Sequence, residues 1–226
     1  MKNVIEKLTV AALYRRPDAC AAWDYLSGFS YPWQALDDLK EEILRVGETL
    51  SEREYCQVER GVWIAKSAKV ASSALIQAPC IIGESTEVRQ GAFIRGSALV
   101  GRGCVVGNST ELKNCILFDG AQVPHYNYVG DSILGYCAHM GAGAVTSNVK
   151  GDKSLVTVQV GDERLETGRR KFGAMLGDHA EIGCHAVLNP GSVIGVGSRV
   201  YPLSFVRGYL EEGTIQKQNG ERVKIK

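Results

Sequence analysis

One histidine and two basic residues are the side chains of this sequence best suited to carry chemistry. His125 lies in the run from Pro124 to Asp131, and Arg89 and Lys113 precede it along the chain. An imidazole can take up a proton near neutral pH. Arg and Lys side chains bind phosphate groups. If the three side chains border one groove, they can hold a phosphorylated substrate and take up a proton from its reacting group.

The segment that must position these residues has an aliphatic side chain at every sixth position. Two positions before it the residue is usually small, as at Ala68, Cys80 and Ala92. The period slips around residue 117, is lost after Ser147 and resumes at Leu176. A period of six fits neither an α-helix nor a plain strand. The first unbroken set is Val58, Ile64, Val70, Ile76, Ile82, Val88, Ile94, Val100, Val106 and Leu112, and the second is Leu176, Ile182, Leu188, Ile194, Val200 and Val206.

A fixed short period predicts a solenoid, in which each repeat buries its apolar face against the next. Three six-residue units would close a triangular coil of about 18 residues, stacked on its neighbour at the strand spacing of about 4.8 Å. Counted in this way, Arg89 and His125 lie near one corner, two coils and roughly 10 Å apart. Lys113 then lies on the adjoining wall.

These hexads resemble the hexapeptide-repeat family of left-handed parallel β-helices, over about two-thirds of the chain. The left-handed winding is an implication of the resemblance, because parallel crossovers are normally right-handed. The expected fold is all-β: a left-handed parallel β-helix of hexapeptide repeats with an N-terminal helical cap and a C-terminal β-hairpin.

The short motifs narrow the resemblance. Five short stretches resemble the acetyltransferase domain of bifunctional glucosamine-1-phosphate acetyltransferase/uridyltransferases. They are the run Pro124–Asp131, Met140-Gly141-Ala142-Gly143, Asn148, Arg89-Gln90-Gly91 and Glu111-Leu112-Lys113. Gly168–Gly173 and Asn189-Pro190-Gly191 are similar to the archaeal-type sugar-1-phosphate acetyl- and nucleotidyltransferases.

This resemblance implies a role for seven residues, with acetyl-CoA as the co-substrate. Direct transfer is expected, because no Cys or Ser lies in a recognisable nucleophile motif. His139 stands where the bacterial enzymes have an asparagine that contacts the sugar. The implied catalytic pair is His125, the general base, and Asn148, near the acetyl group; the implied substrate-binding residues are Arg89, Lys113, Tyr128 and His139; and Arg207 is expected near the pantetheine arm and phosphates of coenzyme A.

Three segments interrupt or flank the repeats. Residues 1–54 show helix spacing from Trp33 to Leu44 and are expected to pack over the open end of the solenoid, which spans 55–207. Residues 147–172 form an excursion with a hairpin near 155–162. The excursion ends in the basic triplet Arg169-Arg170-Lys171, which suits a solvated turn and an anion site equally. Asn219-Gly220 predicts a two-residue hairpin in the tail, 208–226.

Composition excludes several classes of function. With 226 residues, 26 Lys plus Arg against 25 Asp plus Glu and a formal charge of +1, no global field favours nucleic acid or a membrane. Charged residues interrupt the first apolar stretch, so a cytoplasmic protein is expected. Cys56, Cys80, Cys104 and Cys115 occupy the small position of the hexad and are interpreted as reduced core residues. No C-x-x-C motif occurs, and no metal site is assigned.

We therefore expect a homotrimer with sites between subunits that acetylates an amino-sugar phosphate. No Gly-rich nucleotide-binding signature is found, so a separate nucleotidyltransferase is an expected partner. A non-catalytic or regulatory trimeric module is the alternative. A zinc enzyme similar to the γ-type carbonic anhydrases, which share the fold, is a less favoured one, since the four histidines lack that family's close pairing.

Overall fold

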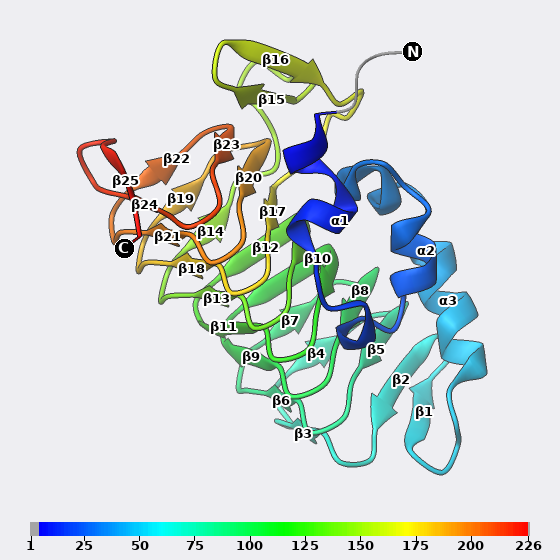
Figure 1. Ribbon diagram of the computed structural model, residues 1–226. Helices are drawn as coiled ribbons and strands as arrows, with labels where there is room; N and C mark the ends of the chain where they lie inside the picture. The colour runs from blue at the N-terminus through cyan, green and yellow to red at the C-terminus, as the bar shows by residue number, and fades with distance from the viewer. Residues whose placement is uncertain (1–4, 226) are drawn as a thin grey trace.

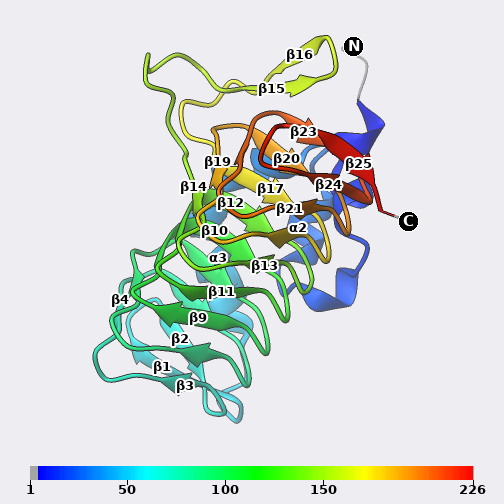
Figure 2. The ribbon, with the colours of Figure 1, turned by 90° about the vertical axis from the view of Figure 1, so that its left-hand side faces the viewer.

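The chain, in a computed structural model that describes residues 5–225, winds into stacked three-walled coils (Figures 1 and 2). The predicted fold, a parallel β-helix of hexapeptide repeats, is confirmed. Wall 1 contains β2 (Val62–Ala65), β5 (Cys80–Ile82), β8 (Ala98–Val100), the second halves of β10 (Glu111–Leu117) and β12 (Tyr128–Leu134), β17 (Ala174–Leu176), β20 (Ser192–Ile194) and β23 (Tyr209–Leu210).

The two other walls contain the remaining parallel strands. Wall 2 consists of β3 (Lys69–Val70), β6 (Glu87–Val88), β9 (Val105–Asn108), β11 (Gln122–His125), β13 (His139–Met140), β18 (Glu181–Ile182), β21 (Arg199–Val200) and β24 (Thr214–Gln216). Wall 3 consists of β4 (Leu75–Ile76), β7 (Phe93–Ile94), the first halves of β10 and β12, β14 (Val145–Thr146), β19 (Val187–Leu188) and β22 (Phe205–Val206).

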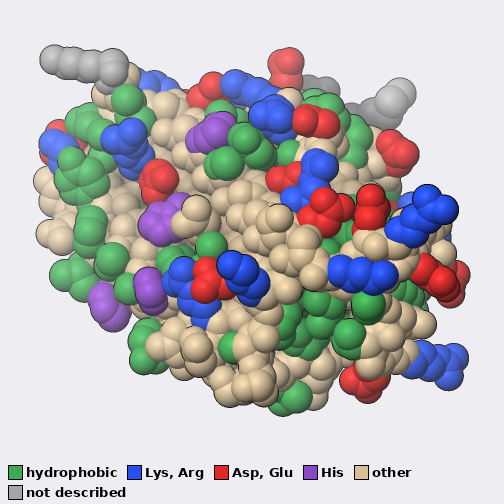
Figure 3. Space-filling model, turned by 90° about the horizontal axis from the view of Figure 1, so that it is seen from below, with side chains coloured by type: hydrophobic (Ala, Val, Ile, Leu, Met, Phe, Trp, Pro, Cys, Tyr) green, Lys and Arg blue, Asp and Glu red, His purple; other side chains and the backbone are tan. Residues whose placement is uncertain are grey.

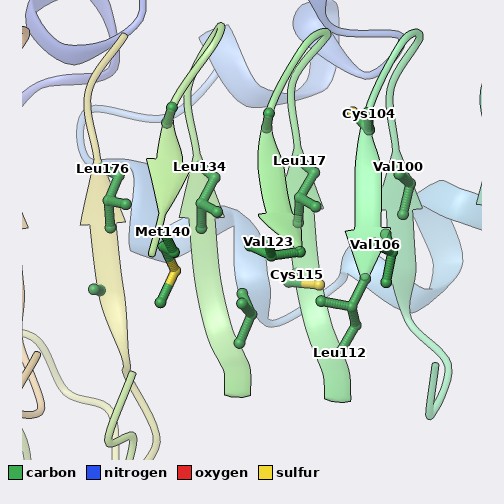
Figure 4. Packing of buried hydrophobic residues seen from close by; sticks show 14 of the residues in the cluster. Val100, Cys104, Val106, Leu112, Cys115, Leu117, Val123, Leu134, Met140 and Leu176 are labelled. Carbon is green, nitrogen blue, oxygen red and sulfur yellow. The ribbon is translucent and has the colours of Figure 1, made fainter. Parts of the chain in front are cut away.

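The aliphatic residues of the hexads point into the coils and stack on their equivalents in the next coil. Leu112 pairs with Val129, and Leu117 with Leu134, and these side chains are fully buried (Figure 4). Most coils contain three full hexads, but two successive coils, from Val100 to Leu117 and from Leu117 to Leu134, are each one residue shorter. The missing residues are at two corners between wall 3 and wall 1, where Asn114 and Asp131 turn the chain with a left-handed φ of 49°. The sequence period slips here because each of these two corners lacks one residue.

The N-terminal segment covers wall 1, and the expectation that it covers the open end is wrong. It comprises η1 (Glu6–Leu8), α1 (Val10–Leu13), η2 (Pro17–Ala19), α2 (Trp23–Ser27), η3 (Pro32–Leu36) and α3 (Leu39–Thr49). Helix α3 contacts β5, β8 and β10 (Figure 1). The physical reason is that wall 1 is apolar on its outer side as well. Its outward row is Trp63, Ile81, Leu99, Ile116, Ile133, Met175, Val193 and Tyr209, all buried beneath the segment or the excursion.

The ends of the solenoid differ from the predicted boundaries. The strand β1 (Tyr55–Glu59) pairs antiparallel with β2, so Cys56 and Val58 are exposed and do not belong to the repeat. Val58 precedes Ile64 by six residues only because a hairpin turn at Gly61 lies between them, and no repeat unit of the solenoid accounts for this spacing. At the other end the coils continue past 207 to β24. The predicted C-terminal hairpin is confirmed as β24 paired with β25 (Arg222–Lys224).

The excursion leaves wall 3 after Ser147 and forms an antiparallel hairpin of β15 (Thr157–Val160) and β16 (Glu163–Glu166). Two corner glycines let β15 approach the coils. A Cβ on Gly191 would lie 2.6 Å from the Thr157 carbonyl oxygen, and one on Gly208 would lie 2.4 Å from that of Gln159. Both glycines have positive φ, so a side chain would be strained as well as crowded. The hairpin is therefore held against the last coils.

Three of the four cysteines assigned to the core are buried there. Cys80, Cys104 and Cys115 are inaccessible, and burial raises the pKa of the Cys104 thiol to about 12. Cys56 is the exception, for the reason given above. Among the described residues, no helix has both the length and the apolar character needed to cross a bilayer.

Candidate functional site

The turn that carries His125 is built by a buried asparagine. The Asn127 side chain accepts a hydrogen bond from the His125 backbone N–H (3.0 Å) and donates to the carbonyl oxygens of Gly141 (2.8 Å) and Ala144 (3.0 Å). The next residue, Tyr126, turns the corner from wall 2 to wall 3 with φ 50°. Because the His125 N–H is bonded to the buried Asn127 side chain and the His125 carbonyl oxygen accepts from the Gly143 N–H, the backbone of His125 is fixed while its side chain remains exposed.

A hydrogen-bonded cluster lies at the opposite edge of wall 3. The Asn148 Nδ2 donates to Asp131 Oδ2 (2.6 Å) and to the Tyr128 hydroxyl (3.2 Å), and Asn114 Nδ2 donates to Asp131 Oδ1 (2.9 Å). We call Asn114, Tyr128, Asp131 and Asn148 the corner cluster. Tyr128 reaches it by lying along its own strand, over Gly130, where an added Cβ would be 2.4 Å from the hydroxyl. Burial, followed by the nearby Asp131 carboxylate, raises the pKa of Tyr128.

Basic side chains surround the corner cluster. Lys113 pairs in register with Gly130 on wall 3, and burial lowers its pKa. The Asp131 carboxylate partly offsets this lowering of the Lys113 pKa, whereas the nearby Lys171 ammonium adds to it. Arg95 follows β7 next to Lys113 and is paired with Glu111 (2.7 Å). Neighbouring ammonium groups repel each other, so a bound phosphate would stabilise this arrangement.

Two of the expected substrate residues lie on wall 2, away from the corner cluster. Arg89 is in register with Pro124, one residue before the His125 level, and its guanidinium bonds Glu87 (3.2 Å). His139 is one coil beyond His125 on the same wall, and its Nδ1 lies 2.9 Å from Glu181 Oε2. The structure thus joins Tyr128 and Asn148 by a hydrogen bond, with Lys113 beside them, and sets His125 across wall 3 at its corner with wall 2. Arg89 lies near that same corner, two coils before His125, and His139 lies on wall 2 in register with Gln122.

Arg207 lies farther along wall 3, beside the excursion. Gly130, Ser147, Asn189 and Arg207 occupy equivalent positions in successive coils of wall 3. Arg207 is therefore three coils beyond Gly130, which is roughly 14 Å at the spacing of parallel strands. It lines a cavity of about 590 Å³ together with Lys150, Arg164 and Asn189. A second cavity, of about 640 Å³, lies at the corner cluster between Asp37 and Lys40 of the N-terminal segment and the basic triplet.

Sequence reasoning missed Arg95 and Asp131, and it gave Lys171 only as part of a basic triplet that suited a solvated turn and an anion site equally. Arg95 could have been found, because it precedes Lys113 by three hexads, the length of one coil, whereas Arg89 precedes it by four and so falls on the previous wall. Asp131 could also have been found, because the length of one shortened coil separates it from Asn114 before it and from Asn148 after it, so the three side chains lie at one corner. Lys171 had no such signal, because the excursion resets the count.

The histidines do not gather into a metal centre within the described part of the chain. Residues 5–225 contain no group of three or more His, Cys, Asp or Glu side chains placed to hold an ion. His179 packs edge-on against Tyr136, and His139 is engaged with Glu181. Figure 3, a view from below, shows the histidine side chains in one half of this face, with basic and acidic side chains near them.

Comparisons with known proteins point to one group of enzymes. A family model described as the GMPPB C-terminal domain matches residues 76–165. The bifunctional sugar-1-phosphate nucleotidylyltransferase/acetyltransferase of Sulfurisphaera tokodaii is 38% identical over 90 residues, which are 40% of this chain and 22% of that protein. Bifunctional protein GlmU of Methanococcus aeolicus is 36% identical over 86 residues, 38% of this chain and 21% of that protein. The matched region thus spans about a fifth of these relatives.

Among solved structures, the acetyltransferase domain of PglB from Neisseria gonorrhoeae FA1090, in complex with acetyl coenzyme A, covers 70% of this chain and 55% of its own, with 17% identity and a TM-score of 0.34. The family model matches the central coils, which include both the His125 turn and the corner cluster. The chain is a hexapeptide-repeat β-helix protein, similar over 90 residues to a bifunctional sugar-1-phosphate nucleotidylyltransferase/acetyltransferase.

Proposed function

We propose that the protein is a sugar-directed acetyltransferase, which moves the acetyl group of acetyl-CoA to the amine of an amino-sugar phosphate. The corner cluster beside Lys113 and Lys171 is the observation that carries this proposal. It combines a site for a phosphate with a tyrosine and an asparagine that can bind neutral polar groups. The similarity to a bifunctional sugar-1-phosphate nucleotidylyltransferase/acetyltransferase over 90 residues supports this choice of reaction.

The proposed reaction is a direct transfer across wall 3. The sugar phosphate is held by Lys113 and Lys171, with Arg95 close to them, and Tyr128 and Asn148 contact the reacting end. His125 takes a proton from the amine as its nitrogen attacks the thioester carbonyl carbon. The tetrahedral adduct then collapses, the C–S bond breaks, and the thiolate of coenzyme A leaves and is protonated.

The co-substrate is proposed to lie along wall 3, parallel to the axis of the solenoid. Lys150, Arg164 and Arg207 give the cavity beside the excursion a positive lining, which suits the phosphates of coenzyme A. Arg207 is separated from the corner cluster along the axis, so an extended pantetheine arm could reach from one to the other. This arrangement would keep the phosphates of coenzyme A and the phosphate of the sugar at opposite ends of one groove, while the thioester reaches the amine.

A homotrimer is part of the proposal, because the groove of one subunit has only one side. Apolar side chains are exposed on wall 3 and at its corner with wall 2, where Val187, Leu203 and Phe205 lie. Such a patch suits a subunit contact. A second copy against it would enclose His125 and the groove. Light scattering should give about three times the 24.5 kDa of the chain. A stable monomer would contradict the intersubunit site.

One observation favours the alternative of a non-catalytic module. Among the described residues no side chain hydrogen-bonds the His125 imidazole, whereas a general base is usually oriented by a third group. In the trimer a neighbouring subunit would have to supply that partner. In a non-catalytic module no partner is needed.

The deciding experiment measures release of the coenzyme A thiol from acetyl-CoA with a panel of amino-sugar phosphates. His125→Asn should lower kcat by about 10²–10⁴-fold with little change in KM. His185→Asn is the matched control: it lies two coils farther along the same corner, has a left-handed φ of 55° that asparagine tolerates, and should retain wild-type rates. Equal rates for the wild type and His125→Asn would remove the base. An inactive wild type that fails to bind coenzyme A would favour the non-catalytic module.

A further inference from the structure

Asp131 is a buried carboxylate at the centre of the corner cluster. Only 3% of its surface is exposed, and it occupies a corner of the chain with φ 49°. Both oxygens are used: Oδ1 accepts from Asn114 and Oδ2 from Asn148. A buried charge is costly unless it is hydrogen-bonded, so these two amides stabilise it in the folded chain.

The carboxylate determines which way the Asn148 amide faces. An ionised carboxylate can only accept hydrogen bonds, so Asn148 must turn its NH₂ group toward Asp131. The second hydrogen of that NH₂ group is directed to the Tyr128 hydroxyl at 3.2 Å. The Asn148 Oδ1 is then the atom left over, and no described residue donates a hydrogen bond to it. Toward a ligand, Asn148 can therefore act only as an acceptor.

We infer that Asp131 is a positioning residue, which orients Asn148 so that its carbonyl oxygen accepts a hydrogen bond from an N–H or O–H group of the substrate. This inference rests on the proposed function, in which the reacting amine of the sugar has an N–H to donate. An acceptor fixed before the amine binds costs no reorganisation when the amine attacks, and it points the nitrogen lone pair away from Asn148.

The same contacts predict what happens in Asp131→Asn. An asparagine at 131 offers one acceptor and one donor, so one of the two neighbouring amides must rotate. Asn114 also donates to the Leu36 carbonyl (3.3 Å), which can only accept, so its orientation is held. Asn148 is held by a tyrosine hydroxyl, which can donate as well as accept. Asn148 is therefore the amide that rotates, and it then presents NH₂ to the substrate.

The experiment is a double-mutant cycle of Asp131→Asn and Asn148→Ala, read out by steady-state kinetics and by urea unfolding. Asp131→Asn should lower kcat by about 10- to 100-fold, with KM for the phosphosugar changed by less than about threefold, because Lys113 and Lys171 remain. In the Asn148→Ala background it should lower kcat by less than about threefold, since its effect acts through Asn148. Asp119→Asn is the matched control: it makes the same change in a carboxylate that accepts two hydrogen bonds from Arg102 at the corner between walls 1 and 2, and it should keep kcat within about threefold of wild type.

The two readouts separate the possible failures. Equal losses of kcat for Asp131→Asn with and without Asn148 would overturn the positioning role while leaving the acetyltransferase assignment intact. Additive effects on the free energy of unfolding would show that the two side chains do not interact, with the same consequence. A wild type that acetylates no amino-sugar phosphate would end the proposed function and the positioning role together, even if the unfolding cycle still showed coupling.

Discussion

Replacement of Ile116 by alanine tests whether the N-terminal segment stabilises the solenoid from the side. Ile116 points outward on wall 1 and is completely buried, in contact with the apolar side chains of the segment. Truncating a buried isoleucine to alanine costs about 2–5 kcal/mol, depending on how far the cavity collapses. For a chain of this size, roughly 3 kcal/mol lowers the Tm by about 6–12 °C.

The matched control is Leu155→Ala in the excursion. It removes the same number of carbon atoms from a side chain that is 51% exposed, so it should change stability by less than about 0.5 kcal/mol. Urea unfolding followed by circular dichroism gives both values, and hydrogen exchange of Leu39–Thr49 should accelerate only in Ile116→Ala. If the stabilities of the two variants differ by no more than about 0.5 kcal/mol, the range expected of surface substitutions, the segment does not cover wall 1.

Three further predictions follow from burial, steric contact and charge. Cys56 and Cys184 should react quickly with a thiol reagent at pH 8, because both are exposed. Burial raises the pKa of Cys104 to about 12, so Cys104 should react only after denaturation. Labelling of Cys104 in the native protein at the rate of Cys56 would contradict the assignment of Cys104 to the core. Gly107→Ala should prevent correct stacking, because its Cβ would overlap the Pro124 carbonyl, while Gly151→Ala meets no atom within 4 Å and should fold as wild type; soluble yield and circular dichroism compare them. Glu212→Gln should cost less than about 1 kcal/mol at pH 7, since the pair with Arg15 is half exposed. Arg15 lowers the pKa of Glu212, so the ion pair stabilises the fold above the ordinary carboxyl pKa, and this stabilisation is lost as the pH falls through the lowered pKa. If the free energies of unfolding of the wild type and Glu212→Gln differ by the same amount from pH 7 to pH 3, this prediction is refuted.

The coils could be predicted from the sequence because each hexad places one aliphatic residue in the core. The six-residue period therefore follows directly from the fold. The same period contained information that was not used. Trp63, Ile81 and Leu99 each precede a hexad residue and recur once per coil, which marks one wall as apolar on both sides. An apolar outer wall must be covered, and the helical segment covers it.

The site was only partly predictable, for two physical reasons. Arg89 and Arg95 both precede Lys113 by a whole number of hexads, but only a whole number of coils returns the chain to the same wall. The contacts of Lys171 depend on where the long excursion, from 147 to 172, rejoins the coils, and no periodicity crosses that gap. The corner cluster itself needed the structure, because it depends on which amide atom faces Asp131.

The direction of the terminal strands limits how these molecules can assemble. A solenoid of stacked coils could in principle lengthen without limit, each molecule adding its first coil to the last coil of another. Here β1 runs antiparallel on the first strand of wall 1, and β25 runs antiparallel on the last strand of wall 2. A second molecule would have to continue all three walls in parallel at once, and each end has one wall whose polarity is reversed. Growth into a fibre is therefore blocked at both ends, and association is directed to the side walls.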